Sequence, residues 1–589
     1  MIILTGPVHR SLISAMPQSL LTRQNERLQI PSPPFAWQAV FAIVLATVQL
    51  AVADSPPALV LTARSADSLI DNAQRLLETA GVPERGAQLR QVLTFVNNLN
   101  GLDHERTLGV LVYLSADHPR EPELIVCLPV RSLDDLFASL APIPNLTLTR
   151  DADPDSWVLR GGDKSLFIRM QDGYAFVAQH RERLSAPLPA LGELTEPQAT
   201  DDLAVTLNTA GIPRALVDKA LNDLHAQGRR DAERKSSESD AEFGLRSRLQ
   251  ADVVWVIEHA LREMDHATIS IRWPRDVGRL ELAATVSIPP QTELARAVSA
   301  VSADGTQFQS IIAADAPFAA TTTWTLSGET RQLAADAVAQ LRRNIERRMQ
   351  QDGSINGPAA QPIRQILDVM TATVDGGQVD GGVVFQGDKP GAMLLLAGTR
   401  IANAADMASA LETLLPLIAE SEAVADLELN AVEAGGVSLH RVTLQEIRKQ
   451  DEWLYGPDVG LYLGAGRDAV WLALGGFDRE ARLQELLARE PVAARTAPPL
   501  LQLDARLSPW LEAGVAVEGK RPHWLGIASA ALAGGRDQVH VEVIAAEDGL
   551  HLNATLDEAY IRVLTAVWRA KHQPADAAAP RKFAAPKRP

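Results

Sequence analysis

One short segment of the chain contains three side chains of the types that bind metal ions. The segment EHALREMDH places His259, Glu263 and His266 at positions i, i+4 and i+7, so a continuous helix would bring all three to one face. Two imidazoles and one carboxylate are a ligand set that zinc accepts in catalytic sites. The two histidines are two turns apart, however, which is wider than the usual i, i+4 pair. An exposed polar stripe explains the pattern equally well, so these residues are candidate ligands and the sequence assigns no metal.

The other motifs indicate no catalytic and no cofactor-binding residue. GAGRDA, from Gly464 to Ala469, has the letters of a nucleotide-binding loop, but the alternating VWLALGG after it predicts a strand and therefore a hairpin turn. We expect Gly161 and Gly162 to occupy the same place earlier in the chain. The sequence has no G-x-S-x-G elbow and no Walker loop. Its one cysteine, Cys127, lies in the apolar run LIVCLPV and is expected to be a small core residue rather than a nucleophile.

The charge balance bears on the partners that the protein can bind. The chain has 73 acidic and 56 basic residues, a formal net charge of −17. Such a surface repels nucleic acid and anionic lipid. The many carboxylates leave open a glycosidase-like hydrolase, but spacing along the sequence does not show which pair would lie at the required separation.

The N-terminal region has the layout of a secretory signal. An apolar run, AVFAIVLATVQLAVAD, follows Arg23 and Arg27 and ends in the small residues of an A-x-A cleavage site, which predicts cleavage between Ala53 and Asp54. The leader before the run is long, and a start at Met16 instead of Met1 would give a more usual length. Cleavage removes three arginines and one glutamate and takes the net charge to −19. We therefore expect an exported protein, periplasmic or extracellular, with no membrane span after removal of the signal.

Six segments of the first half have counterparts in the second half, in the same order. Each pair shares a short β-rich run, a Gly turn or a polar cap, and a helix with apolar positions three and four apart. The pairs are 56–77 and 315–341, 90–114 and 364–386, 122–143 and 390–418, 156–184 and 460–483, 201–221 and 498–515, and 267–301 and 538–567. The order predicts a tandem duplication.

The resulting fold class is α+β, with two homologous halves, each an antiparallel or mixed β-sheet with helices packed on one face. The expected organisation is a signal peptide with a long leader over 1–53, a first repeat over 54–310, a second over 311–570, and a disordered Ala/Pro/Lys tail over 571–589. The first repeat carries a charged insertion near 226–250. Its mixed charges favour a solvated helix or loop over an arm that binds a partner.

Several segments of the mature chain resemble sequences of one group of proteins. They are the strand and helix start from Ala63 to Leu69, the phrase LPVRSLDDLFASL from Leu128 to Leu140, and DGYAFVA from Asp172 to Ala178. Together they are similar to a group of uncharacterised exported proteins of planctomycete-type bacteria. The resemblance covers most of the mature chain and is strongest in its first half. It implies export but brings no activity and no functional residues.

These observations favour a non-catalytic exported protein of the periplasm or cell envelope, a binding or structural module of unknown specific activity. Two similar halves commonly enclose a cleft, where an unknown ligand or envelope protein would bind. The alternative is an exported hydrolase with a carboxylate-based site between the halves. Carboxylates or histidines with perturbed pKa values clustered near the junction would favour the hydrolase.

Overall fold

The structure is a computed structural model. It describes residues 56–572, except for 81–98, 118–120, 142–144, 163, 191–200, 232, 235–239, 275–277, 302–304, 313–315, 327, 352–356, 448, 490–497, 512–522 and 533–535. The predicted signal over 1–53 and the predicted tail over 571–589, apart from Lys571 and His572 at the end of a helix, therefore lie outside the described residues. Within the described part, every helix is too short or too polar to cross a bilayer.

The first ten strands form an entirely antiparallel sheet. Its strands lie side by side in the order β4 (Leu146–Arg150), β5 (Ser156–Gly161), β6 (Lys164–Gln171), β7 (Tyr174–Ala178), β3 (Glu123–Pro129), β2 (Leu108–Tyr113), β1 (Leu59–Ala63), β8 (Leu203–Asn208), β9 (His266–Arg272) and β10 (Arg279–Ser287). Each strand thus pairs mainly with strands close to it in sequence, as the alternating runs and Gly turns predict.

The second ten strands repeat this order. They are β14 (Val424–Ala434), β15 (Val437–Leu444), β16 (Val459–Gly466), β17 (Ala469–Gly476), β13 (Leu394–Arg400), β12 (Gln378–Gln386), β11 (Phe318–Thr325), β18 (Pro499–Arg506), β19 (Gln538–Ala546) and β20 (Gly549–Asp557). Each strand of this half has the number of its counterpart plus ten.

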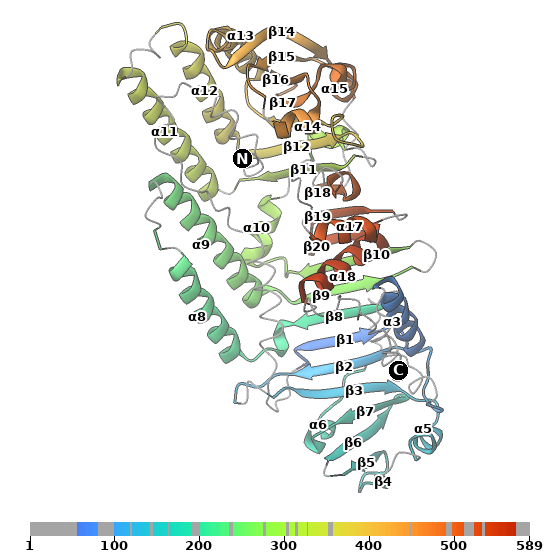
Figure 1. The fold of residues 1–589 in the computed structure, drawn as a ribbon. Coiled ribbons are helices and arrows are strands. Elements are labelled where there is room, and N and C mark those ends of the chain that lie inside the picture. Colours follow the sequence, from blue (N-terminus) through green and yellow to red (C-terminus); the bar gives the residue numbers. More distant parts are fainter. Residues whose placement is uncertain are drawn as a thin grey trace, which may run out of the picture.

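The two sets of strands join into one sheet of 20 strands. Strands β10 and β20 pair antiparallel, from Arg279 opposite Asp557 to Ser287 opposite Gly549. Figure 1 shows the result, a long twisted stack of strands that runs from β14 at the top to β4 at the bottom. Because β10 and β20 are neighbours in the sheet, they leave no gap between the halves where they meet.

Helices cover both faces of the outer parts of the sheet, so the expectation of helices on one face is wrong there. In the second half, Leu395 belongs to a core with Tyr455 of α14 (Lys449–Tyr455). The adjacent residues Leu394 and Leu396 point to the opposite face and pack with Leu483 of α15 (Glu480–Ala488). The physical reason lies in continuous apolar runs such as MLLLAG, which bury both faces of a strand rather than one.

The first half shows the same arrangement. Phe176 and Cys127 face a core that includes Leu184 of α6 (Arg181–Ser185). Ala175 faces the other core, with Leu136 of α5 (Leu133–Leu140). Cys127 is fully buried, as expected, and burial raises the pKa of its thiol to about 12.

The centre of the sheet, from β8 to β18, has two unlike faces. On the polar face, the side chains follow the strand registers in the order Thr206, Thr268 and Ser270, Glu281 and Thr285, Asn553 and Thr555, His540 and Glu542, Gln502 and Asp504. On the apolar face, the order is Val205, Ile269 and Ile271, Leu282 and Ala284, Leu552 and Ala554, Val541 and Val543, Leu501 and Leu503. Strict alternation along each strand produces this separation.

Helix α10 (Glu293–Val301) packs on the apolar face. Its Leu294 and Val298 form a core with Val286 of β10 and Leu550 of β20, so the helix lies across the strands that join the halves. On the polar face, Asn553 is exposed. Helix α10 thus covers the apolar face at the centre of the sheet, whereas helices cover both faces toward its ends.

Two long helical hairpins lie on one side of the sheet (Figure 1). The charged insertion near 226–250 falls in the first, formed by α8 (Arg214–Asp231) and α9 (Asp240–Glu263). The second is formed by α11 (Gly328–Gln351) and α12 (Ala360–Gly376). The other helices of the described residues are α3 (Ala66–Ala80), α13 (Ala404–Ala419), α17 (His523–Leu532) and α18 (Glu558–His572), with short 3-10 turns η3 (Thr209–Gly211), η4 (Gln307–Ile311) and η5 (Phe477–Arg479).

Close packing at η4 requires glycine on the strands beneath it. Gly382 and Gly398 are directly opposite each other in β12 and β13. A Cβ atom on Gly398 would lie 2.4 Å from Phe308 of η4 and 2.8 Å from Trp471 of β17. The two aromatic rings meet edge to face at 5.2 Å between centroids. The missing side chains therefore create the space in which this aromatic pair sits.

Candidate functional site

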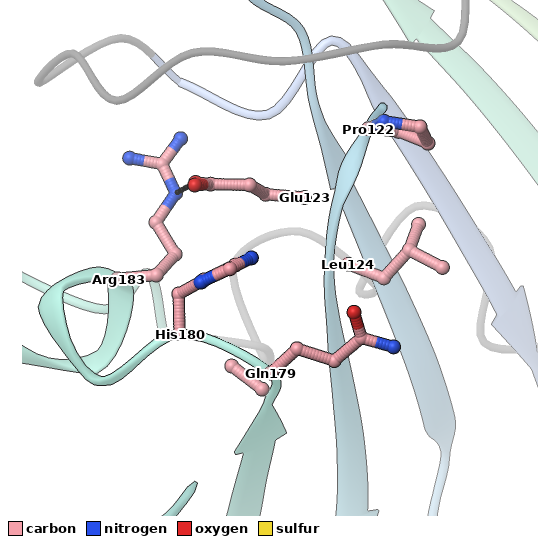
Figure 2. A pocket seen from close by; sticks show the side chains of 7 residues that line it. Pro122, Glu123, Leu124, Gln179, His180 and Arg183 are labelled. Carbon is pink, nitrogen blue, oxygen red and sulfur yellow. Dashed lines mark ion pairs between the residues drawn. The ribbon is translucent and has the colours of Figure 1, made fainter. Parts of the chain in front are cut away.

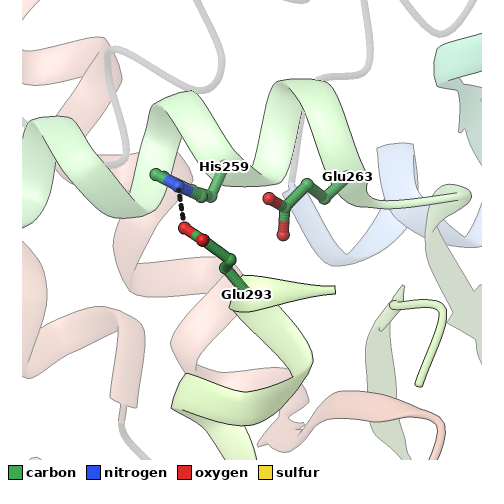
Figure 3. A group of neighbouring side chains, drawn as sticks. All are labelled: His259, Glu263 and Glu293. Atoms are coloured by element: carbon green, nitrogen blue, oxygen red, sulfur yellow. Dashed lines mark hydrogen bonds and ion pairs between the residues drawn. The ribbon is translucent and has the colours of Figure 1, made fainter. Parts of the chain in front are cut away.

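The structure brings together two of the three candidate metal ligands and replaces the third. His259 and Glu263 lie one turn apart on α9, and their side chains meet Glu293 at the start of α10 (Figure 3). Helix α9 ends at Glu263, and His266 is the first residue of β9. The prediction that His266 shares their helix face is therefore wrong. Its ring bonds instead to the carboxylate of its neighbour Asp265.

The ring of His259 is held on two sides. Its Nδ1 lies 2.8 Å from the main-chain oxygen of Trp255, and the imidazole stacks on the indole of Trp255 with 3.9 Å between centroids. Its Nε2 lies 3.2 Å from Oε2 of Glu293. Glu263 is fixed separately, because its Oε2 accepts a hydrogen bond of 2.8 Å from the Leu294 N–H at the start of α10. One ligand atom from each of the three residues lies within 4.8 Å of the other two.

A second cluster lies on the polar face, next to the strands that join the halves. His540 and Glu542 on β19 are directly opposite Asp504 and Gln502 on β18. The Nδ1 of His540 is 2.9 Å from Asp504 Oδ1, and its Nε2 is 3.4 Å from Glu542 Oε1. Sequence reasoning did not identify these residues. The available signal was the spacing of two polar residues at i and i+2 in each strand, which indicates one polar face but not which strands are neighbours.

The electrostatics of this cluster favour a protonated histidine. The hydrogen bond that His540 donates to Asp504 is the largest influence, and together with the charges of both carboxylates it raises the pKa of His540 despite partial burial. Asp504 is only 6% exposed and also accepts a 3.2 Å hydrogen bond from Gln502. Gln502 in turn accepts a 2.9 Å bond from Gln309 of η4. Since both nitrogens of His540 face carboxylates, the ring is suited to hold a proton or to donate one.

Figure 2 shows a small cavity in the first half, between β3 and α6. It measures about 60 Å³ and is lined by Glu123, His180 and Arg183 among others. Arg183 Nε lies 3.2 Å from Glu123 Oε2, and both side chains are almost completely buried. The Arg183 guanidinium also lies over the ring of Tyr113, 3.6 Å from its centroid. Because Arg183 already contacts Glu123 and Tyr113, we assign these side chains a structural role in packing α6 on β3.

A wider hollow opens at the β5–β7 end of the sheet. It has a volume of about 520 Å³ and is lined by Asp153, Asp155 and Arg169 together with the turn at Asp172 and Gly173. This hollow and the cavity at Arg183 both lie in the first half and away from β10 and β20.

The glycines of the GAGRDA segment belong to a hairpin, as predicted. Gly464 and Gly466 are in β16, and the turn to β17 is made by Arg467 and Asp468, both with positive φ. A Cβ on Gly464 would lie 1.9 Å from the Ser438 carbonyl oxygen, so this glycine permits close strand packing.

The predicted counterpart of this turn is wrong by one hairpin. Gly161 and Gly162 connect β5 to β6, whereas the strands in the same position as β16 and β17 are β6 and β7. The turn that matches Arg467 and Asp468 is the one at Asp172 and Gly173. Several turns of the chain contain glycine, so a shared glycine did not identify the matching turn.

Comparison with known proteins adds no further assignment: no protein-family model, no curated protein and no solved structure matches this chain.

Proposed function

We propose that this chain is an exported, non-catalytic binding or structural protein of the periplasm or cell envelope, built by tandem duplication. The observation that carries the proposal is the polar face, which continues from the strands of one half across β10 and β20 to those of the other. The identical strand order of the halves supports the duplication. The signal-like segment before Asp54 supports export.

The chemistry of the polar face suits a ligand that is recognised by hydrogen bonds. Hydroxyl and amide groups are interspersed there with charged ones: Thr206 and Thr268 are linked by a 3.0 Å hydrogen bond, and the exposed Asn553 shares its face with Glu281 and Glu542. Main-chain pairing holds β10 against β20, so these groups are presented on a preorganised surface. A partner that spans both halves would therefore bind without first ordering them.

Crosslinking in the native envelope tests this role. A photoreactive amino acid placed at Asn553 is expected to give a discrete crosslinked product, and the same residue at Leu564, an exposed position of α18, serves as the control. Equal labelling from both positions, or none from Asn553, would count against a binding role for the polar face. Mass spectrometry of the same material tests export separately, with Asp54 expected as the first residue and an intact N-terminus contradicting it.

One observation favours a hydrolase as the second candidate. His540 lies between Asp504 and Glu542 beside the junction, and its raised pKa is the property expected of a general acid. This function requires that the purified protein hydrolyse a substrate and that Asp504→Asn abolish the hydrolysis without unfolding the chain. Activity that survives Asp504→Asn and His540→Gln would remove the cluster from consideration.

A further inference from the structure

We propose that His259, Glu263 and Glu293 bind one Zn²⁺ ion, which links α9 to α10. The three donors come from two elements that are separated in sequence by a strand hairpin, β9–β10, and the fold brings them within 4.8 Å of one another. One imidazole nitrogen and two carboxylate oxygens are ligands that zinc accepts, with water at the remaining position. Glu293 is exposed, which leaves room for that water.

The tautomer of His259 gives the first argument for a cation. The main-chain oxygen of Trp255 accepts hydrogen bonds only, so Nδ1 at 2.8 Å must carry the proton. In the neutral ring, the lone pair of Nε2 then points at Oε2 of Glu293, 3.2 Å away, where two acceptors face each other. A cation between them removes this conflict. A ring whose other N–H is bonded to a main-chain carbonyl is also the arrangement that orients histidine ligands of zinc.

The carboxylates give the second argument. The Leu294 N–H holds Oε2 of Glu263, so this side chain is oriented toward Glu293 before any metal binds. Arg296 lies 3.8 Å from Oε1 of Glu293, and the other oxygen of that carboxylate faces His259. His259 thus has Nδ1 held by the main chain and Nε2 directed at Glu293, and each glutamate has one oxygen contacted by a group of α10.

A metal at this position would fasten a projecting element to the sheet. Helix α9 belongs to the long hairpin at the side of the molecule, and α10 packs across the strands that join the halves. The role is therefore structural: the ion would fix the hairpin relative to the junction.

Zinc titration of the metal-free protein, purified without a histidine tag, tests the site. We expect one tightly bound equivalent by calorimetry, and a higher unfolding temperature in its presence. Glu293→Gln, on an exposed side chain, and His259→Gln should each weaken binding about tenfold or more, since even the loss of a residue that only supports a ligand costs that much. Co²⁺ substitution should give a visible absorption band in the native protein that both variants lose.

His266→Gln is the matched control, because this nearby histidine is outside the cluster and should bind zinc unchanged. The alternative explanation is a protonated His259 paired with Glu293 and no metal. An absence of zinc binding by the native protein would establish that alternative. Binding that persists in both Glu293→Gln and His259→Gln would place the ion elsewhere. Either result overturns the proposal.

Discussion

Ala283 of β10 lies directly opposite Asn553 of β20, at the middle of the strand pair that joins the two halves of the sheet. The pairing extends over all nine residues of each strand and ends at the ion pair between Arg279 and Asp557, with 3.2 Å between Nε and Oδ1. Because β9 and β19 flank this pair on either side, neither β10 nor β20 is an edge strand. The connection between the halves is therefore as continuous as the interior of each half.

Proline at the junction should weaken this connection. Ala283→Pro removes a main-chain donor from a strand that is paired on both sides, which we expect to cost on the order of 2–3 kcal/mol of unfolding free energy. The measurement is urea unfolding followed by circular dichroism. Ala283→Ser keeps the donor and is the control. The same urea midpoint for the two variants would mean that the pairing contributes little to stability.

The Phe308–Trp471 contact predicts a second effect on stability. Gly398→Ala places a Cβ within 2.4 Å of the Phe308 ring and should destabilise the protein by about 1–3 kcal/mol through overpacking. Gly526→Ala, on the exposed surface of α17 with nothing within 4 Å of the added atom, should stabilise it by up to about 1 kcal/mol. Thermal unfolding of both variants checks the difference. If they shift in the same direction, the close packing described here is not what requires glycine at position 398.

The fold elements were largely predictable from the sequence, but their assembly was not. Alternating runs such as QVHVEV indicate strands, and the repeated order of motifs indicates two similar halves. Nothing in the sequence shows that β10 would pair with β20, because strand alternation specifies the faces of a strand and not its neighbours. The same limit hid the contact of His540 with Asp504, which depends on the β18–β19 register.

The candidate metal ligands show where an inference from helical spacing fails. His259 and Glu263 were recognised because both lie on α9. His266 begins the alternating run HATISIR, so the period changes from helix to strand just before it. Glu293 was missed because it is 30 residues farther along, beyond a complete hairpin, and only the three-dimensional fold brings it back to α9.

His540 should make stability depend on pH on the alkaline side. Its pKa is raised in the folded state, chiefly by the hydrogen bond to Asp504. The protonated ring therefore makes its full contribution to the free energy of unfolding below the unfolded pKa of about 6.5. That contribution is lost as the pH rises through the folded pKa, and the free energy of unfolding then changes by at most about 1.4 kcal/mol per pH unit. The stability advantage of the native protein over His540→Gln should shrink between pH 6 and pH 9. A constant difference would contradict the charged cluster.

His440 should have the opposite effect. It is 1% exposed, and burial lowers its pKa, while its Nδ1 accepts a hydrogen bond of 3.2 Å from the Asn430 N–H in the edge strand β14. As the pH falls, His440 is protonated in the unfolded chain at a higher pH than in the folded protein. The free energy of unfolding therefore decreases as the pH drops below about 6.5. Unfolding temperatures at pH 7.5 and pH 5.5 should differ more for the native protein than for His440→Gln. Equal changes would show that His440 is protonated without cost in the folded state.

The places where the two helical hairpins are inserted in the chain determine the surface that a partner would contact on their flank of the sheet. The first, α8–α9, follows β8, but the second, α11–α12, follows β11, whose counterpart in strand order is β1. The two hairpins are therefore not counterparts of each other in the strand order, and both lie on one flank of the sheet, where Figure 1 shows them in line. A partner that contacts both hairpins would meet two unlike elements, so we expect it to dock on this flank in a single orientation.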